Sequence, residues 1–325
     1  MTPVLRRAIA VLGVYAVGAL IAETIIRRTT KSPPGAHSFT TTTGSQLSWT
    51  QVDGGAKAAD LPILVFGGDI GLASEAWNGV ARAAQAAGFD VLLYDRVGLG
   101  SSGPRRPSSA ASLGRRSEVA GKELAELIKA VAPERRVVLV GSGYGALVAS
   151  DALTFGADCS GLILVDPSFP GDWLRFSRHL FTRLRDRRIE TVITSVTLKL
   201  GGGWLRIPPP MSAELDRPVR RLIRATDRSS ATWMALLHEI AATLEARHTA
   251  NCVASRLPRM TIVASKRLRA TSPHLCQHWQ DTLALSGGIY RAPEWLSVFD
   301  RPPVGPIAER FVSLISASVE MEHRA

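Results

Sequence analysis

The chain of 325 residues has only three cysteines, Cys159, Cys252 and Cys276, which lie far apart and are odd in number. A disulfide framework needs paired cysteines, and a structural zinc site needs closely spaced cysteine and histidine ligands. Neither pattern is present. We therefore expect three buried thiols, no resident metal and no cofactor.

Aromatic residues are also scarce, at 6% of the chain, and they are not interleaved with the basic residues. The net charge of +11 and the pI near 10.3 point to an acidic partner or surface. Because the chain has no known nucleic-acid-binding motif and no aromatic residues placed to stack on bases, that partner is not expected to be nucleic acid. The chain has no internal repeat or low-complexity tract, and its length suits one large α/β domain with an insertion or two modest domains.

Charged residues are nearly absent from residues 8–26, which contain Glu23 as their only charge between Arg6–Arg7 and Arg27–Arg28. At about 1.5 Å per residue this segment spans a hydrocarbon core of about 30 Å. We interpret residues 1–31 as a single-pass membrane anchor. Because arginines flank both ends of the apolar run, the sequence does not determine which end faces the cytoplasm. A signal or transit sequence and a buried helix are the alternatives, although no A-x-A cleavage site follows the apolar run.

Apolar strands and helices alternate after a linker, "KSPPGAHS", and a predicted β-hairpin. Examples of strands are "PILVF", "DVLLYD", "RVVLVG", "GLILVD" and "MTIVAS". Short apolar strands separated by helices predict a mostly parallel sheet that is covered on both faces. Residues 32–170 and 257–325 then form the two parts of the core, and residues 171–256 form an inserted helical cap that is rich in arginine.

Four motifs resemble the α/β-hydrolase family, and within it the membrane-anchored microbial hydrolases. "FGGDIGLASEAW" is similar to the family's H-G-x-x-G oxyanion loop, and "YDRVGLGSSGP" to its Y-D-R-x-G-x-G-x-S motif. "LILVDPS" matches a strand that carries L-V-D-P, and "FDRPPV" matches the D-R-P that follows the catalytic histidine. The resemblance covers nearly the whole chain and implies the α/β-hydrolase fold.

The same resemblance implies that the catalytic triad is degenerate. In "VGSGYGA", Ser142 takes the place of the family's histidine before the nucleophile, and Gly143 takes the place of the nucleophile. Counting back from "DRP" places Trp295 where the catalytic histidine is expected. No Asp or Glu occurs in residues 246–280, where the family's acid follows the strand "MTIVAS". Asp166 is a possible residual acid, and Ser142 is the candidate for a substitute nucleophile, although it lies one residue before the tip of the elbow.

The oxyanion loop departs from the family pattern as well, because Phe66 replaces its histidine. Gly67 and Gly68 would keep a vestigial loop, in which the amide of Gly68 persists. Gly141, Ser142, Tyr144 and Gly145 would keep the shape of the elbow around Gly143. We expect Phe66 and Trp295 to fill the former pocket and leave no cavity beside Gly143.

Three functional hypotheses follow. The first is an inactive hydrolase-like protein that serves as an accessory subunit of a membrane complex. The second is a divergent enzyme, either a serine hydrolase that uses Ser142 or a nucleotide-binding protein, since "GSGYGA" with Asp166 downstream also fits G-x-G-x-x-A. The third is a protein that binds a hydrophobic ligand in the old pocket. The sequence favours the first, because three catalytic positions have changed together.

The basic charge is concentrated in the cap. Residues 174–228 hold thirteen Arg or Lys against five Asp or Glu. This excess predicts contact with anionic lipid headgroups or with acidic subunits of a membrane complex, the alternative being a solvated surface. It favours the mitochondrial inner membrane, where anionic lipids abound, with a bacterial plasma membrane as the alternative.

Deletion of residues 1–31 tests the anchor. The truncated protein should stay in the supernatant after cell lysis, because the proline-glycine linker separates the apolar segment from the core. Extraction with carbonate and with salt is the measurement. A truncated protein that remains in the membrane fraction would show that another part of the chain binds lipid.

Overall fold

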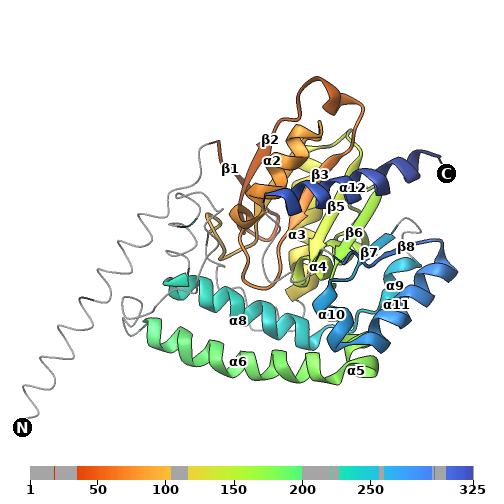
Figure 1. Ribbon diagram of the computed structural model, residues 1–325. Coiled ribbons are helices and arrows are strands. Elements are labelled where there is room, and N and C mark those ends of the chain that lie inside the picture. The colour runs from red at the N-terminus through yellow and green to blue at the C-terminus, as the bar shows by residue number, and fades with distance from the viewer. Residues whose placement is uncertain are drawn as a thin grey trace, which may run out of the picture.

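A computed structural model describes residues 35–103, 116–199, 227–255, 260–294 and 305–324, together with Gly18, Arg220 and Leu296. One eight-stranded sheet forms the centre, in the order β1-β2-β4-β3-β5-β6-β7-β8 (Figure 1). β1 and β2, and β2 and β4, are antiparallel, and the other neighbours are parallel. The strands are β1 His37–Thr40, β2 Gln46–Val52, β3 Ile63–Gly67, β4 Val91–Asp95, β5 Val137–Ser142, β6 Gly161–Val165, β7 Met260–Val263 and β8 Ile289–Arg291.

Helices cover both faces of the sheet, which confirms the predicted fold class. Side chains of α2 and α12 pack with one set of strand residues, and side chains of α3, α4 and α11 pack with the other. The bounds of these helices are α2 Asn78–Ala86, α3 Arg116–Val131, α4 Tyr144–Thr154, α11 Pro273–Ser286 and α12 Pro306–Arg324. The central strands β3 to β6 are buried along their whole length, as expected for parallel strands between two helical layers.

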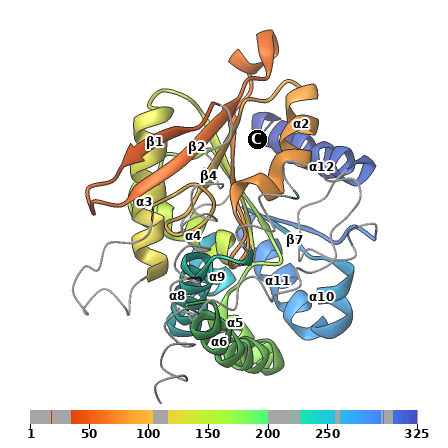
Figure 2. The same cartoon turned by 90° about the vertical axis from the view of Figure 1, so that its left-hand side faces the viewer.

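A further group of helices lies between β6 and β7 in the chain. In Figures 1 and 2, α6 lies at the outer edge of this group and α8 lies between it and the sheet. Short helices follow on either side of β7 and complete this end of the molecule. The bounds are α5 Pro170–Phe176, α6 Arg178–Lys199, α8 Ser230–Glu245, α9 Ala250–Ala254 and α10 Lys266–Thr271.

Two local expectations differ from the structure. Of the three thiols expected to be buried, Cys276 is buried, Cys159 is partly exposed and Cys252 is exposed. The sequence also predicts one helix over residues 74–87 with Ser74 as its N-cap, whereas the structure has a 3₁₀ turn, η2 Ser74–Trp77, followed by α2, and the side chain of Ser74 caps neither. The amide of Ser74 instead donates to the carboxylate of Asp95, at 2.8 Å. The predicted anchor at residues 8–26 lies outside the described residues. Among the described helices, none has the length and apolar character needed to cross a membrane.

Close packing of α4 against β3 and β5 explains two glycines of "GSGYGA". A Cβ on Gly145 would overlap the backbone of Gly67, and a Cβ on Gly141 would lie 2.6 Å from the backbone of Ala146. Both positions therefore exclude a side chain. Of the two glycines that also suit a nucleotide loop, Gly141 is accounted for by this contact between strand and helix, and Gly143 lies at the tip of the turn.

Gly145→Ala should therefore lower the free energy of unfolding by about 1–3 kcal/mol, the usual cost of overpacking a tight core. Denaturant unfolding measures this change. Gly103→Ala is the matched control, because a Cβ there would make only an ordinary contact, 3.7 Å from Gln46. Equal stability of the two variants would contradict the packing argument.

Candidate functional site

The turn between β5 and α4 has the shape of a nucleophile elbow with a glycine at its tip. Gly143 has φ of 50° and ψ of −113°, a left-handed backbone conformation that favours glycine. Its amide donates to the carbonyl of Val165 at 3.0 Å, and its carbonyl accepts from the amide of Ser168 at 3.0 Å. The elbow is thus held firmly by backbone bonds, and residue 143 itself brings no reactive side chain.

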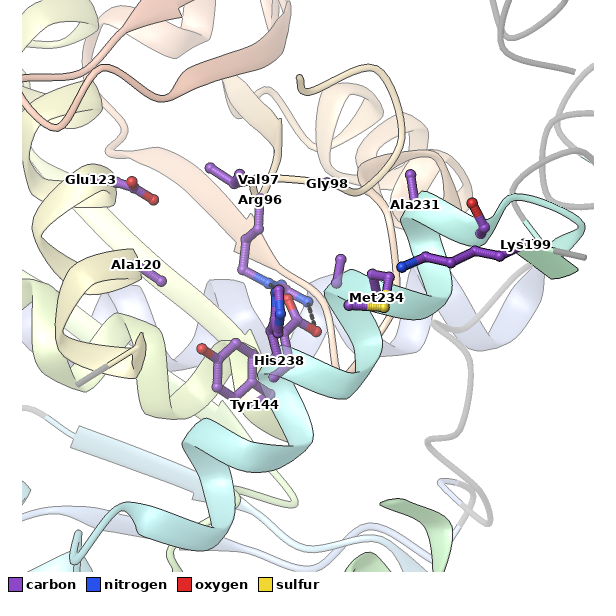
Figure 3. Close-up of a pocket in the computed structure, with 13 residues that line it drawn as sticks. Arg96, Val97, Gly98, Ala120, Glu123, Tyr144, Lys199, Ala231, Met234 and His238 are labelled. Carbon is purple, nitrogen blue, oxygen red and sulfur yellow. Dashed lines mark hydrogen bonds and ion pairs between the residues drawn. The ribbon is translucent and has the colours of Figure 1, made fainter. Parts of the chain in front are cut away.

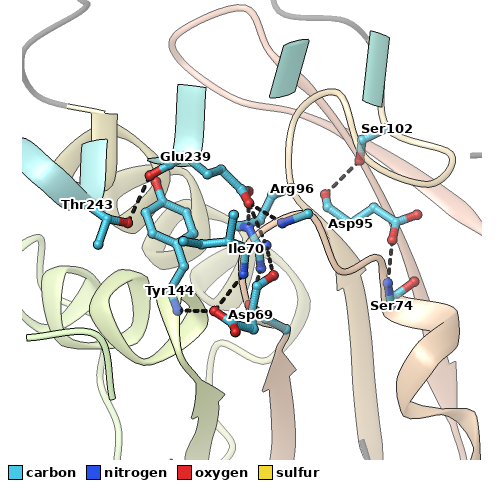
Figure 4. A network of polar contacts seen from close by, with 11 residues as sticks. Asp69, Ile70, Ser74, Asp95, Arg96, Ser102, Tyr144, Glu239 and Thr243 are labelled. Atoms are coloured by element: carbon cyan, nitrogen blue, oxygen red, sulfur yellow. Dashed lines mark hydrogen bonds and ion pairs between the residues drawn. The ribbon is translucent and has the colours of Figure 1, made fainter. Parts of the chain in front are cut away.

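A carboxylate from the neighbouring loop lies at the tip of this elbow. Oδ1 of Asp69 accepts hydrogen bonds from the amide of Tyr144, at 2.9 Å, and from the amide of Ile70, at 2.7 Å (Figure 4). A Cβ built on Gly143 would overlap the carboxylate of Asp69. Asp69 therefore occupies the space into which a side chain at residue 143 would project.

The environment of Asp69 combines burial with positive charge. Burial raises the pKa of the Asp69 carboxyl, and the amides of Tyr144 and Ile70 and the charges of Arg187 and Arg96 oppose that increase. The net pKa stays above its usual value. A carboxylate of raised pKa that is held in one orientation is typical of groups that attack carbon or accept a proton.

A buried ion pair fixes the loop that carries Asp69. Nε of Arg96 lies 2.6 Å from Oε1 of Glu239, and its two terminal nitrogens donate to the carbonyls of Gly68, at 2.7 Å, and Asp69, at 2.9 Å (Figure 4). Oε2 of Glu239 accepts from the amide of Gly71 at 2.7 Å. Residues from β4, the loop after β3 and α8 are thereby joined at one point.

A pocket of about 520 Å³ opens beside the elbow. Asp69 and Gly143 line it together with Asp166, and Arg183 and Arg187 of α6 lie on its cap side. A volume of several hundred cubic ångströms suits a small molecule. The expectation that this pocket is filled was therefore wrong.

Strand periodicity explains that error. Phe66 is completely buried on the other side of the sheet, where its ring lies 4.9 Å from the ring of Trp77. Successive side chains of a strand point to opposite faces, so the residue at position 66 does not reach the elbow. Trp295, the other expected filler and the residue at the histidine position, lies outside the described residues.

Asp166 lies on the same pocket, at the end of β6. Its φ of 42° is the only positive φ among the described residues other than glycine, and its Oδ1 accepts from the amide of Ser265 at 2.8 Å. Ser265 lies two residues after the end of β7, in the region where the family pattern predicts an acid. The carboxylate of Asp166 thus reaches the position next to the end of β7 from the neighbouring strand.

The other residues named from the sequence have structural roles. Ser142 is 1% exposed and lines no described pocket, and its Oγ has no hydrogen-bond partner among the described residues, so it is not placed to attack a substrate. A Cβ on Gly68 would lie 2.9 Å from the carbonyl of Leu72. The sequence assigned the surviving oxyanion amide to Gly68, whereas Ile70 and Tyr144 provide the amides that converge.

A second pocket, of about 290 Å³, lies near the Arg96–Glu239 pair (Figure 3). Arg96, Tyr144, His238 and Glu239 are among its lining residues, and neither Asp69 nor Gly143 is. The ring of Tyr144 also lies beneath the guanidinium of Arg96, 5.3 Å from centroid to Cζ. The pocket that contains the elbow is therefore the candidate active site.

Sequence reasoning missed Asp69, although "FGGD" carried a signal for it. An acidic residue directly follows the two glycines of the oxyanion loop, and that loop meets the elbow in this fold. The contact between Asp69 and the elbow depends on how the two loops meet in the folded chain, which the local sequence does not show. The described residues contain no group of three metal-ligating side chains.

The comparisons with known proteins identify the family and the fold. Residues 64–302 match the alpha/beta hydrolase family, and the chain belongs to that family. A search of curated proteins finds no match. Among solved structures, the Cif epoxide hydrolase from Acinetobacter nosocomialis is 13% identical with a TM-score of 0.61, and the match covers 94% of this chain and 96% of that one.

Two further solved structures show the same fold. A thermophilic esterase from Thermogutta terrifontis is 17% identical with a TM-score of 0.60, covering 89% of this chain and 99% of that one. The enol-lactonase from Burkholderia xenovorans LB400 is 17% identical with a TM-score of 0.56, covering 87% of this chain and 100% of that one. These likenesses establish the fold.

The prediction of an inactive accessory subunit of a membrane complex, and of a chain that is not an enzyme, is contradicted by these findings. The family is one of hydrolases, and the structures that share the fold include an epoxide hydrolase, an esterase and an enol-lactonase. The prediction equated the missing side chain at Gly143 with a missing reactive group. The carboxylate of Asp69 lies in that space instead.

A second pair of carboxyl groups is buried beside the loop. Glu75 of η2 is 5% exposed, and Asp95 at the end of β4 is 2% exposed. Burial, together with the charge of Asp95, raises the pKa of Glu75 to about 8. Because this value exceeds the ordinary 4.5, folding favours the protonated acid, and stability falls as the pH rises from about 4.5 to about 8.

Glu75→Gln should remove much of this pH dependence. The melting temperature of the unmodified protein should fall between pH 5 and pH 9 by more than that of the variant, because a neutral amide has no proton to lose. Thermal unfolding across that range is the measurement, with the exposed acid variant Glu134→Gln as control. Parallel curves for Glu75→Gln and the unmodified protein would refute the buried-acid assignment.

Proposed function

We propose that this chain is a hydrolase that opens epoxides through the carboxylate of Asp69. The observation that carries the proposal is the position of Asp69 at the elbow, with Oδ1 bonded to the amides of Ile70 and Tyr144. These amides are the kind of donors that stabilise an oxyanion in this fold. Here the two amides bind an oxygen of the protein itself. This arrangement distinguishes direct attack of water on the substrate from attack by the carboxylate of Asp69.

Direct attack of water on a substrate ester requires the oxyanion of the substrate to occupy the amide pair. Asp69 already occupies it. If Asp69 instead forms an alkyl ester with the substrate, the atom that later becomes tetrahedral is Cγ of Asp69, and the oxyanion is Oδ1. The amide pair is preorganised for that intermediate, so the geometry favours attack of the carboxylate on a carbon electrophile.

The reaction then has two steps. Oδ2 of Asp69 bonds to a ring carbon of the epoxide, the carbon–oxygen bond of the ring breaks, and the alkoxide, facing the charge of Arg187, takes a proton from water. A second water attacks Cγ and gives its proton to Asp166, which passes it to Oδ2 as the Cγ–Oδ2 bond breaks. The diol leaves with the oxygen that Asp69 contributed, and the new carboxyl of Asp69 loses its proton to the hydroxide formed in the first step.

Support for the assignment of roles comes from the pocket. Asp69, Asp166 and Arg187 all line it, and the charge of Arg187 lowers the pKa of Asp69 against the effect of burial. Nucleophile, base and electrophilic partner are thus present without the residues of a serine–histidine–acid triad. We infer that this set replaces the triad and that the family's nucleophile has moved from the elbow to the oxyanion loop.

We also propose, from the sequence alone, that residues 8–26 anchor this enzyme as a member of a membrane-bound branch of the family. Its location in a mitochondrial inner membrane or a bacterial plasma membrane stays a prediction. Contact of the basic cap with anionic headgroups or with neighbouring membrane proteins also stays a prediction.

Asp69→Asn should lower the turnover of a panel of aryl and aliphatic epoxides by about 10³-fold or more, as expected for a lost covalent nucleophile. Diol formation followed by chromatography is the measurement. Asp186→Asn is the matched control, because Asp186 lines the same pocket without contacting the elbow amides. Equal losses in both variants would show that Asp69 has no special role.

Oxygen labelling distinguishes the covalent mechanism from base catalysis. In a single turnover in water enriched in ¹⁸O, the diol should contain unlabelled oxygen and the label should appear in Asp69. Label in the first diol molecule would show direct attack by water.

The double variant Asp69→Gly/Gly143→Asp, which moves the carboxylate to the elbow, should recover part of the activity that Asp69→Gly loses. Hydrolysis of nitrophenyl esters without any epoxide opening would overturn the proposal.

A further inference from the structure

The outer face of α6 carries an apolar stripe that the described parts of the chain leave uncovered. Four β-branched residues on this helix are strongly exposed, whereas large hydrophobic residues are exposed at only three other described positions: Phe155, Leu285 and Ile307. Exposed apolar groups that gather in one place mark an interaction site. The four are Ile189 at 62%, Val192 at 41%, Ile193 at 62% and Val196 at 51%.

Helical spacing places the four residues together. Positions 189, 192, 193 and 196 differ by three, four and seven, so they form one stripe along the helix. The buried residues Leu184, Thr191, Ser195 and Leu198 form a different face of α6. α6 packs against α8 and α5, so that face is its attachment to the protein. The four exposed residues lie on another face of α6 than these buried ones, and α6 itself lies at the outer edge of the described helices (Figures 1 and 2).

Basic side chains surround the stripe. Arg185 and Arg188 lie beside its first residue, and Arg178 and Lys199 lie at the two ends of the helix. All four are exposed, and none forms an ion pair with a described residue. The two acids of the helix, Asp186 and Glu190, are exposed three residues before Ile189 and Ile193, so they border the stripe on the side of the active-site pocket, which both also line.

We propose that α6 lies in the surface of an anionic bilayer, with this stripe among the acyl chains. An interfacial helix combines a narrow apolar face with basic residues at its border, whose long stems let the charges reach the headgroups. A second copy of the chain fits less well, because two such surfaces would bring like charges together. Each basic residue near a charged membrane contributes about 1 kcal/mol.

Depth-dependent quenching tests this contact on the full chain. Ile193→Cys and Leu285→Cys are labelled separately with the fluorophore NBD, in a background with Cys159→Ser and Cys252→Ser. The labelled proteins are reconstituted with vesicles of phosphatidylcholine alone or mixed with phosphatidylglycerol, each with and without a doxyl lipid quencher. Leu285 is 91% exposed on α11 and is the matched control.

With phosphatidylglycerol present, the label at residue 193 should shift its emission to the blue and lose intensity to the quencher, and the label at residue 285 should do neither. Arg185→Gln with Arg188→Gln should weaken the quenching at residue 193, and added salt should do the same. A predicted anchor at residues 8–26 would hold the chain on both kinds of vesicle, so the difference between them reports on α6.

Three results would overturn the proposal. The label at residue 193 could show no quenching on either vesicle, or the same quenching as the label at residue 285. The third result is a blue shift that grows with protein concentration in the absence of lipid, which would assign the stripe to a second copy of the chain.

Discussion

The ion pair between Arg96 and Glu239 holds the rest of the site in place. Both side chains are buried, and burial alone would lower the pKa of Arg96, but the charge and hydrogen bond of Glu239, together with the tyrosines Tyr94 and Tyr144, raise the net pKa above its usual value. Removing one partner of such a pair typically costs about 3–5 kcal/mol, because the other is left charged and unpaired. Here the loss would also free the carbonyls of Gly68 and Asp69. The loop, the elbow and α8 therefore depend on one interaction.

The "DRVGLGSS" motif places Arg96 for this ion pair. Asp95 accepts from the amides of Ser74 and Ser101, each at 2.8 Å, while Gly100 passes so close to Asp95 that a Cβ there would overlap it. Ser102 donates to the carbonyl of Asp95 and accepts from the amide of Ser48. The motif thus folds the end of β4 into a rigid turn, from which the side chain of Arg96 reaches the loop after β3.

The sequence was sufficient for the architecture but not for the chemistry. The period of the apolar runs and the glycines of "GSGYGA" predicted the parallel sheet and the elbow, since both depend on local patterns. Asp69 was missed because its role arises where two loops from separate strands meet. The filled pocket was wrongly predicted because Phe66 was assigned to the face of the elbow without counting the strand alternation. Asp166 was named as a candidate from the sequence, and its bond to Ser265 is visible only in three dimensions.

The attachment of Asp69 to a loop has a consequence for how the enzyme could be regulated. A side chain on the elbow moves with the central sheet, and it keeps its orientation when a cap opens. Asp69 belongs to a segment whose amide at Gly71 and carbonyls at Gly68 and Asp69 are bonded through the Arg96–Glu239 pair to α8. Displacement of α8 would therefore disorganise the reactive carboxylate itself. On the proposed mechanism, an open cap and an assembled nucleophile exclude each other, so entry of the substrate and chemistry are separated in time.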